Sequence, residues 1–323
     1  MGFSYERFNR RFGGLISLGL GVLTLLMVRR GLSYAPIAVG LVVLAWTLWA
    51  GLGRLVPVRS DRTSRLLVLA SAAGQSFVVS LYQNVLFYLL PVWFGSATWP
   101  SLNVIFPCLL AAMAVFSCFE YPYRAVVLDR PVVKTLWTAV IMFALLVPTA
   151  TLIVVLPLRT YIALSAGLSA LLSAGALMPR PLHPRAYLRV ALLLVAALSS
   201  TALITLFAPY LPPVPLVCLE QAAGTGVVSR EVVGVGSVFP AGTERVYAHF
   251  AVVAPARFAQ EVRFQWFHNG EEAGQSLPGE VTGGRARGYR TWTWKSRPAP
   301  GDWRADLLTA DGQLIGRVRF QVE

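Results

Sequence analysis

The residue types that most often do chemistry in proteins are few in this chain and stand apart from one another. None of the three histidines is spaced to share a metal ion with a second histidine, a cysteine or a carboxylate: His183, His249 and His268. The three cysteines include no C-x-x-C pair and are expected to be free thiols: Cys108, Cys118 and Cys218. The sequence also contains no nucleophile elbow and no phosphate-binding loop. We therefore predict no catalytic residue, no metal site and no cofactor.

An aromatic stretch, Gly288–Ser296 (GYRTWTWKS), is the first candidate binding feature. Trp292 and Trp294 alternate with threonines, so in a strand both rings share one face with Arg290. Two placements fit this alternation. The rings complete the core of a small domain, as large aromatic side chains usually do, or they form an outward ledge that binds a partner or a glycan. We favour the core, and we keep Arg290, Trp292 and Trp294 as the candidate partner or glycan surface.

Neutral polar residues inside long apolar runs are the second candidate feature. Four of them fall in two neighbouring runs: Gln75, Gln83, Asn84 and Asn103. One interpretation is hydrogen bonding between helices, worth about 1 kcal/mol or less for each contact. The other is a polar cavity for a lipid headgroup or a small solute. We favour the helix contacts.

Two basic residues, Lys134 and Arg189, each lie about one helical turn inside an apolar run. Long basic side chains at such positions reach the membrane surface with their charged ends. Both residues are also candidate contacts for the headgroup of an anionic lipid or for an anionic substrate. We favour the first interpretation.

The elements that hold these residues follow from composition. The chain has 323 residues, of which 56% are hydrophobic and only 13% are charged. Residues 1–214 contain four acidic and sixteen basic residues, whereas residues 215–323 contain eleven and twelve. The positive charge therefore accompanies the apolar part, which is typical of membrane proteins and does not indicate a nucleic-acid partner.

Seven apolar runs are long enough to cross a bilayer, which takes about 20 residues. They are Phe12–Val28, Tyr34–Leu55, Leu66–Phe94, Ala97–Phe119, Val132–Leu158, Tyr161–Met178 and Tyr187–Pro209. With the N-terminus inside, the cytoplasmic loops hold thirteen basic residues and the opposite loops hold three. We therefore expect a seven-helix transmembrane domain over residues 1–214, with the N-terminus in the cytoplasm. Residues 215–323 would then lie on the other side of the membrane from the cytoplasm, in the periplasm of a double-membrane bacterium.

Residues 215–323 have the alternation and turn signals of a β domain. The expected strands are Thr225–Arg230, Arg245–Val253, Glu261–His268, Arg287–Lys295, Asp302–Thr309 and Leu314–Val322. Asn269-Gly270 and Asp311-Gly312 are typical hairpin dipeptides. Strands with one apolar face each predict an all-β sandwich after the helical bundle.

The run APGDWRADLLTADGQLIGRVRF resembles the closing hairpin of immunoglobulin-like domains. Together, RFQWFHNG, GYRTWTWKS and PGDWRADLLTADGQLIGRVRFQV resemble a C-terminal domain family of bacterial envelope proteins that is known only as a domain of unknown function. Members often follow a multi-span membrane region. The resemblance covers roughly residues 240–323 and implies an immunoglobulin-like fold and an envelope location. It implies no activity.

Three functions are compatible with this organisation. The first is a non-enzymatic anchoring or assembly protein of the bacterial inner membrane, whose periplasmic domain binds a protein partner or an envelope glycan. The second is a transporter or channel-like protein for a neutral or lipid substrate, with the β domain as a cap. The third is a membrane enzyme acting on lipid-linked envelope precursors. We favour the first, with membrane lipids, other membrane subunits and a periplasmic protein or glycan as partners.

Overall fold

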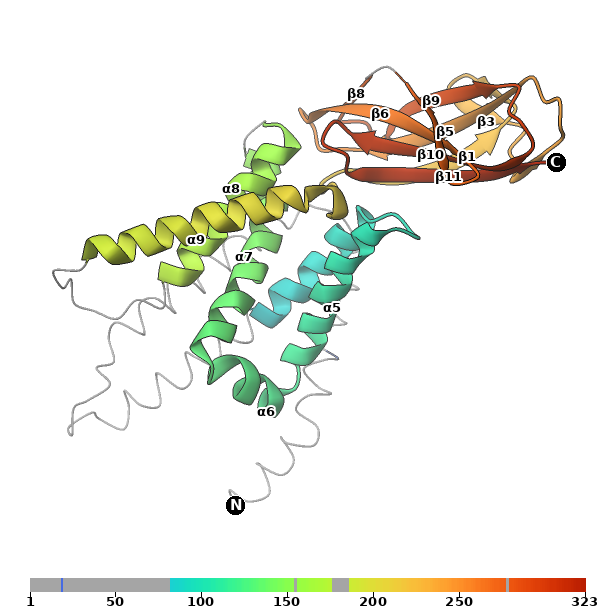
Figure 1. Cartoon of the computed structure of the whole chain (residues 1–323). Helices are drawn as coiled ribbons and strands as arrows, with labels where there is room; N and C mark the ends of the chain where they lie inside the picture. The colour runs from blue at the N-terminus through green and yellow to red at the C-terminus, as the bar shows by residue number, and fades with distance from the viewer. Residues whose placement is uncertain (1–18, 20–81, 154–155, 176–185, 277–278) are drawn as a thin grey trace, which may run out of the picture. The chain divides into compact units, whose positions relative to one another are not determined.

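The structure is a computed structural model that describes residue 19 and residues 82–153, 156–175, 186–276 and 279–323 (Figure 1). These residues belong to two compact units. The described parts of residues 92–107, 150–163 and 202–323 form one unit, which contains all the strands. The remaining described residues belong to a helical unit. The first two predicted spans, Phe12–Val28 and Tyr34–Leu55, lie outside the described residues except for Gly19.

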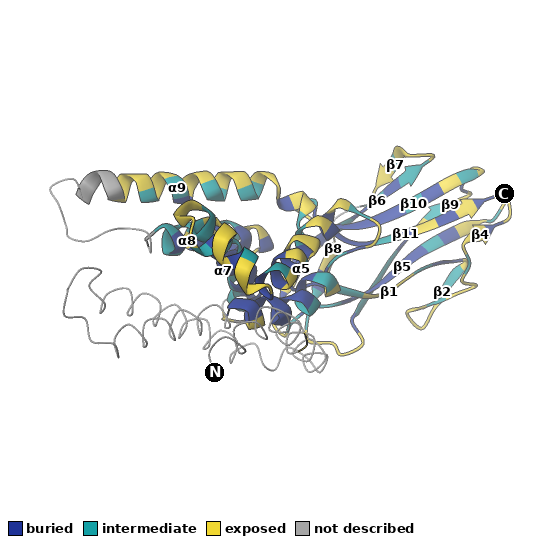
Figure 2. Cartoon of the chain, turned by 90° about the horizontal axis from the view of Figure 1, so that it is seen from below, coloured by how far each residue is buried: buried dark blue, intermediate teal, exposed yellow. Residues whose placement is uncertain are grey.

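The helices carry most of the apolar sequence. Residues 82–95 are helical, and the labelled helices are α5 (Ile105–Ser117), α6 (Glu120–Tyr123), α7 (Pro131–Ile153), α8 (Leu158–Gly175) and α9 (Ala186–Leu206). Short turns of helix adjoin them: η3 (Leu102–Val104), the π-helical turn η4 (Arg124–Leu128) and η5 (Ala208–Tyr210). Figure 2 shows that α9 is exposed along most of its length.

The prediction of a seven-helix transmembrane bundle is wrong. Among the described residues, one helix is long and apolar enough to cross a membrane, over Pro131–Thr151 of α7. A second crossing is counted only if Leu102–Ser117 and Glu120–Leu128 are taken as one span, although these two segments are bent by 109° at the break between them. Described parts of α8 and α9 form shorter apolar helices.

The predicted span Ala97–Phe119 shows why hydropathy overcounts. Its first residues form a loop with a cis peptide bond at Trp99-Pro100, followed by η3. The remaining helix α5 has 13 residues. At 1.5 Å per residue it is about 20 Å long, which is shorter than the hydrocarbon core of about 30 Å. An apolar run measures composition, whereas a crossing needs a continuous straight helix.

Aromatic packing holds the bend between α5 and α7 in the helical unit. The rings of Phe116, Tyr123 and Trp137 lie with their centroids 5.5 to 6.4 Å apart, in edge-to-face or tilted orientations. Tyr123 is buried and belongs to the short helix α6. The chain therefore turns at residues 118–123 around a packed aromatic cluster.

The C-terminal region is β-rich. Its strands are β1 (Val217–Gly224), β2 (Gly226–Val228), β3 (Glu231–Val233), β4 (Val238–Phe239), β5 (Arg245–Val253), β6 (Ala259–His268), β7 (Glu271–Gln275), β8 (Gly279–Thr282), β9 (Tyr289–Ser296), β10 (Gly301–Thr309) and β11 (Leu314–Val322). One sheet has the order β1-β5-β9. The other has the order β4-β11-β10-β6-β7, with β8 also paired to β6. The hairpin β2–β3 forms a two-stranded sheet of its own.

The two sheets lie face to face (Figure 1), and buried apolar side chains fill the space between them. Phe250 on β5 is fully buried, and its ring lies 5.8 Å from that of Phe264 on β6. Trp266 packs edge-to-face on Trp303 and Phe320 in the same layer. The alternation predicted for β6, β10 and β11 therefore places the expected side chains in the core.

Both predicted hairpin dipeptides are confirmed. Asn269-Gly270 joins β6 to β7, with both residues at positive φ (50° and 88°), as a two-residue hairpin turn requires. Asp311-Gly312 lies in the turn between β10 and β11, which pair antiparallel along their length. The second turn joins the two strands whose register brings Trp303 opposite Phe320.

Candidate binding surface on the outer sheet face

The aromatic stretch Gly288–Ser296 lies on β9, and its two tryptophans face away from the core. Thr293, between them, is buried and accepts a hydrogen bond from the indole Nε1 of Trp266 at 3.4 Å. Trp292 is half-buried and Trp294 is 49% exposed. The favoured placement of these rings in the core is therefore wrong. Thr293 fills the inward position because Trp266 already occupies the space beneath it.

The outer face of β5 and β9 gathers the large side chains of both strands. The cross-strand neighbours on this face are Arg245 with Ser296, Tyr247 with Trp294, His249 with Trp292, and Ala251 with Arg290. The Tyr247 and Trp294 rings lie 6.1 Å apart between centroids and are tilted by 41°. His249 and Trp292 are nearly parallel at 6.5 Å. We call Tyr247, Trp292 and Trp294 the aromatic ledge.

The β2–β3 hairpin covers one side of this face. The His249 Nε2 lies 3.0 Å from the carbonyl oxygen of Arg230 and donates a hydrogen bond to it. Glu231 forms an ion pair with Arg290. These contacts leave His249 buried, whereas Trp294 stays open to solvent. The hairpin therefore forms a wall beside the aromatic ledge.

A glycine on β1 allows the hairpin to approach so closely. A Cβ atom on Gly224 would lie 2.5 Å from a methyl carbon of Val232 and 2.6 Å from the carbonyl oxygen of Val233. Real Cβ atoms essentially never make contacts this short, so a side chain here would displace the hairpin. The glycine thus helps to set the position of the wall.

A cation borders the open end of the ledge. Arg245 is exposed, and its side chain hydrogen-bonds to that of Tyr247. Within the described part of the chain, Arg245 takes part in no ion pair. Arg245, Tyr247 and Trp294 together present a charged donor beside two aromatic rings. Sequence reasoning missed Arg245 and Tyr247, although the alternation of Arg245, Tyr247 and His249 already assigned them to one face of the predicted strand.

The described members of the predicted polar cluster make separate sets of contacts. Gln75 lies outside the described residues, and Asn84 is exposed. Gln83 is buried and donates to the sulfur of Cys118 at 3.3 Å. Asn103 is buried and belongs to a different set of contacts, described next. The hydrogen bond of Gln83 to Cys118 joins two segments of the helical unit, as in the favoured interpretation of these polar residues as contacts between helices.

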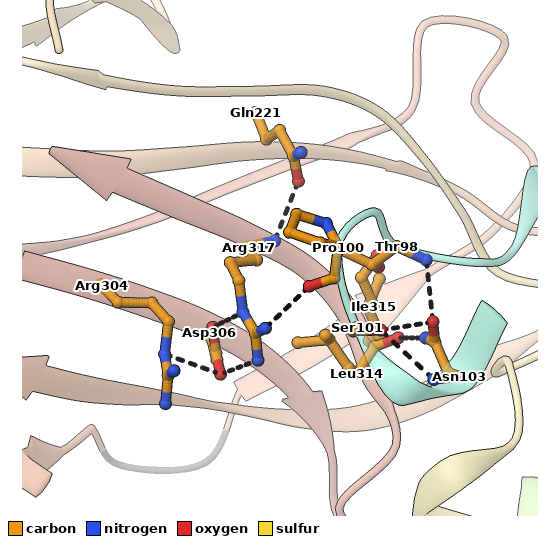
Figure 3. Close-up of polar contacts among 10 residues, drawn as sticks. All are labelled: Thr98, Pro100, Ser101, Asn103, Gln221, Arg304, Asp306, Leu314, Ile315 and Arg317. Carbon is orange, nitrogen blue, oxygen red and sulfur yellow. Dashed lines mark hydrogen bonds and ion pairs between the residues drawn. The ribbon is translucent and has the colours of Figure 1, made fainter. Parts of the chain in front are cut away.

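Asn103 holds a loop to the β-rich region within one compact unit (Figure 3). Its Nδ2 donates to the Leu314 carbonyl oxygen at 3.1 Å, and its Oδ1 accepts from the Thr98 amide at 3.1 Å. The Thr98 hydroxyl donates to the Ile315 carbonyl oxygen at 3.1 Å. Residues 98–103 are thereby fixed to the start of β11.

An ion pair completes this attachment (Figure 3). Arg317 binds both carboxylate oxygens of Asp306, at 2.7 and 2.8 Å, and donates to the Pro100 carbonyl oxygen at 3.1 Å. Asp306 is only 4% exposed. Bidentate pairs of this kind fix geometry as well as charge. We call Asn103, Thr98, Asp306 and Arg317 the loop clamp.

The two predicted headgroup contacts lie on different helices. Lys134 is half-buried in the first turn of α7. Arg189 lies near the start of α9, and the structure describes only its place on that helix. Within the described ranges there is no group of three or more His, Cys, Asp or Glu side chains that could hold a metal ion.

The chain thus combines apolar helices with a two-sheet β-rich region. It belongs to a family of unknown function (DUF5924), whose model matches residues 4–234. A second model, described as a protein of unknown function (DUF2914), matches residues 259–322. These matches agree with the expected unknown-function family, and neither shows that the protein is a membrane protein. No curated protein matches the chain.

The two matches divide the β-rich region. The first ends after β3, and the second contains β6 to β11, so β5 lies between them. The sheet β1-β5-β9 therefore takes one strand from each matched region and one from the intervening segment. The aromatic ledge is formed by β5 and β9, where these segments meet.

Proposed function

We propose that this protein is a non-enzymatic, membrane-anchored binding protein whose β-rich region binds a glycan outside the cytoplasm. The observation that carries the proposal is the aromatic ledge with its half-exposed Trp294. Flat aromatic rings suit the apolar C–H faces of sugar rings, and a neighbouring arginine and hydroxyl supply hydrogen bonds to sugar oxygens. Tyrosine and tryptophan combine an apolar ring with a polar atom and are enriched at binding interfaces, so exposed rings beside polar donors favour a binding role.

The helices support the anchor. The apolar stretch Pro131–Thr151 of α7 is long enough to cross a bilayer. Helix α9 exposes large apolar side chains over several turns: Val190, Leu192, Leu194, Val195, Leu198, Leu203 and Leu206. Helices of water-soluble domains usually show a polar face to solvent. Lipid chains are the environment that would cover such a surface.

The charges around α7 support the orientation. Arg124, Arg130 and Lys134 surround its N-terminal end, and Arg159 alone follows its C-terminal end within the next ten residues. The positive-inside rule then places the start of α7 in the cytoplasm. The end of α7 belongs to the same compact unit as the β-rich region, so that region would lie on the other side.

The distance between the helical anchor and the aromatic ledge leaves the ledge accessible to a ligand. Trp294 lies opposite Tyr247, which lies opposite Gly224 at the far end of β1. Gly224 is seven residues from Val217, where β1 begins, and seven strand residues span about 23 Å. The ledge is thus separated by most of a strand from the segment that joins β1 to α9.

A labelling experiment tests the orientation. In a chain without its native cysteines, Ser237→Cys and Tyr121→Cys place single thiols at exposed positions near β4 and in α6. A membrane-impermeant maleimide added to cells with an opened outer envelope should label the first variant only. The second should react only after the membrane is permeabilised. The reverse pattern would overturn the proposed orientation.

A sedimentation experiment tests the binding role. The full-length protein in detergent should co-sediment with insoluble envelope polysaccharide, and Trp294→Ala should reduce the bound fraction severalfold. Arg319→Ala, at an exposed position of the other sheet, is the matched control and should bind normally. Equal binding by all three proteins, or none by the wild type, would contradict glycan binding at the ledge.

A further inference from the structure

The basic residues around β9 differ in whether they are already engaged. Between Glu280 and Asp302 the chain contains five basic residues and no acid: Arg285, Arg287, Arg290, Lys295 and Arg297. Arg290 pairs with Glu231, and Lys295 donates to the Ala273 carbonyl oxygen at 2.8 Å while lying over the ring of Trp303. Both are therefore part of the packed domain.

Two arginines near the ledge remain available to a ligand. Arg245 and Arg297 are both exposed, and they lie at the same end of the β5–β9 pair, because Arg245 is opposite Ser296. Among the described residues neither forms an ion pair. Glu244 is the neighbouring acid: its charge acts on Arg245, and its carbonyl oxygen accepts from the Arg297 amide at 2.9 Å. The two arginines and this one acid leave a net positive charge. The open end of the aromatic ledge is therefore positively charged.

We infer that the glycan bound at this surface is anionic and carries carboxylate groups, as in chains of uronic acids. The inference rests on the proposed glycan-binding function and names its ligand class. One sugar ring packs on Trp294 and Tyr247, and its carboxylate accepts hydrogen bonds from Arg245. Arg297, which follows Ser296 at the same end of the strand pair, would bind the next acidic unit of the chain.

Charge complementarity favours this ligand over a neutral sugar. Guanidinium groups bind carboxylates through two parallel hydrogen bonds, and such charge-assisted bonds are stronger than neutral ones. A neutral glycan would use the aromatic rings and would leave the charge of Arg245 unmatched. An acidic glycan uses both features of the surface at once.

The test is calorimetric titration of the full-length protein in detergent with defined hexasaccharides. The acidic probes are hexamers of galacturonic, mannuronic and glucuronic acid, and the neutral probes are hexamers of galactose, mannose and glucose. We expect at least one acidic probe to bind at least about tenfold more tightly than its neutral counterpart, which corresponds to one charge-assisted hydrogen bond. Raising the salt concentration should weaken this binding because the contact is exposed.

Variants assign the roles of the two features. Arg245→Gln should reduce the preference for the acidic probe severalfold, whereas Trp294→Ala should weaken the binding of both probes. Arg319→Gln is the control for a general loss of positive charge and should change neither. Melting curves establish that each variant is folded, which the exposure of all three positions favours.

The outcomes separate this inference from the function on which it rests. Equal affinity for acidic and neutral probes, both lost in Trp294→Ala, would overturn the anionic ligand and keep glycan binding. Absence of binding to all six probes would overturn the inference, and the sedimentation experiment then decides whether glycan binding itself fails. Binding that is equally weakened by Arg245→Gln and Arg319→Gln would show unspecific attraction and would also overturn it.

Discussion

Asp306 is a carboxylate in the interior whose charge is met by guanidinium groups. Arg317 binds both of its oxygens, and the Arg304 Nε lies 3.4 Å from one of them. The Arg304 guanidinium also covers the ring of Phe267 at 3.7 Å. A buried ion pair adds little net stability, but loss of one partner leaves an uncompensated charge. Asp306 therefore makes the loop clamp depend on Arg317.

Arg317→Met should destabilise the protein by up to about 3 kcal/mol, because Asp306 then stays buried with only its longer contact to Arg304. Urea unfolding of the full chain, followed by tryptophan fluorescence, measures the change. Arg319→Met, two residues along β11 and exposed, should change the free energy of unfolding by less than about 0.5 kcal/mol. The double variant Asp306→Leu with Arg317→Met should recover part of the loss. Similar small effects of both single variants would show that the ion pair between Asp306 and Arg317 does not contribute to the stability of the fold.

Cys218 is the second residue whose chemistry is set by packing. It is half-buried, and its sulfur lies 3.0 Å from the place that a Cβ atom on Gly316 would occupy. Burial raises the pKa of the thiol from 9.0 to about 12, although a hydrogen bond with the backbone of Glu220 partly opposes this rise. The thiolate is the reactive form, so the folded protein should keep this cysteine inert.

Iodoacetamide at pH 8.5 should modify Cys218 slowly in the folded protein and rapidly in urea, as measured by mass spectrometry of the peptide. Because the folded pKa is raised, the folded state retains a proton that the unfolded state loses. The associated stability is complete below pH 9 and falls as the pH rises from 9.0 toward about 12. Cys218→Ala should remove this alkaline loss. Rapid alkylation in the folded protein would contradict the burial of the sulfur.

The tryptophans of β9 show what residue patterns can and cannot predict. Alternation correctly placed Trp292 and Trp294 on one face, because successive side chains of a strand point to opposite sides. It could not decide which face is buried. The buried face of β9 is the one that carries Thr293, because Thr293 contacts Trp266 of the other sheet. Trp266 lies 27 positions earlier in the chain. Such a contact has no signal in the local sequence.

At the scale of elements, strands with strong alternation were predictable and the others were not. The bounds predicted for β5 and β11 agree with the structure, and β11 alternates apolar with polar residues along most of its length. Strand β1 was missed because VCLEQAAG has no such alternation. Its small residues are needed for the close approach of the β2–β3 hairpin at Gly224. The need for small residues in β1 therefore comes from the β2–β3 hairpin that packs against it, and local alternation does not report it.

The β2–β3 hairpin turns through two residues that are not glycine but have positive φ, Ser229 (50°) and Arg230 (68°). Ordinary side chains adopt this conformation at a cost, whereas Asn and Gly are favoured in it. Asn269-Gly270 occupies the equivalent turn between β6 and β7. The hairpin beside the ledge is therefore less favoured locally than its counterpart, and its contacts with His249 and Arg290 hold it in place.

Replacing Ser229→Asn together with Arg230→Gly should stabilise the hairpin by about 1 kcal/mol. Hydrogen exchange of the β2 and β3 amides measures this as slower exchange. The backbone carbonyl contact with His249 is kept in this variant. The reciprocal change, Asn269→Ser with Gly270→Arg, should speed exchange at the β6–β7 turn. No change in either hairpin would mean that the turn conformation is set by packing and not by residue type.

At the scale of the molecule, two segments distant in sequence come together beneath the β10–β11 turn within one compact unit. The turn η3 contacts η5, and Gln313 donates to the Leu211 carbonyl oxygen at 3.2 Å. Both segments expose large apolar or aromatic side chains, which we call the collar: Trp99, Leu102, Phe207 and Tyr210. The collar lies where apolar helices end and the β-rich region begins.

Under the proposed anchoring, the collar lies in the interface between lipid and water, where Trp and Tyr are enriched. In vesicles, lipids brominated near the headgroup should quench Trp99, which is 63% exposed, more than lipids brominated deep in the chains. The difference in quenching between the wild type and Trp99→Phe isolates this contribution from the other tryptophans. Trp294→Phe is the control. Its ring lies about 23 Å along the strands from the start of β1, so it should not contact lipid. Unchanged quenching in Trp99→Phe would show that the collar contacts protein or water and not lipid. The loop clamp would then attach residues 98–103 to the β-rich region without setting the distance of that region from a bilayer.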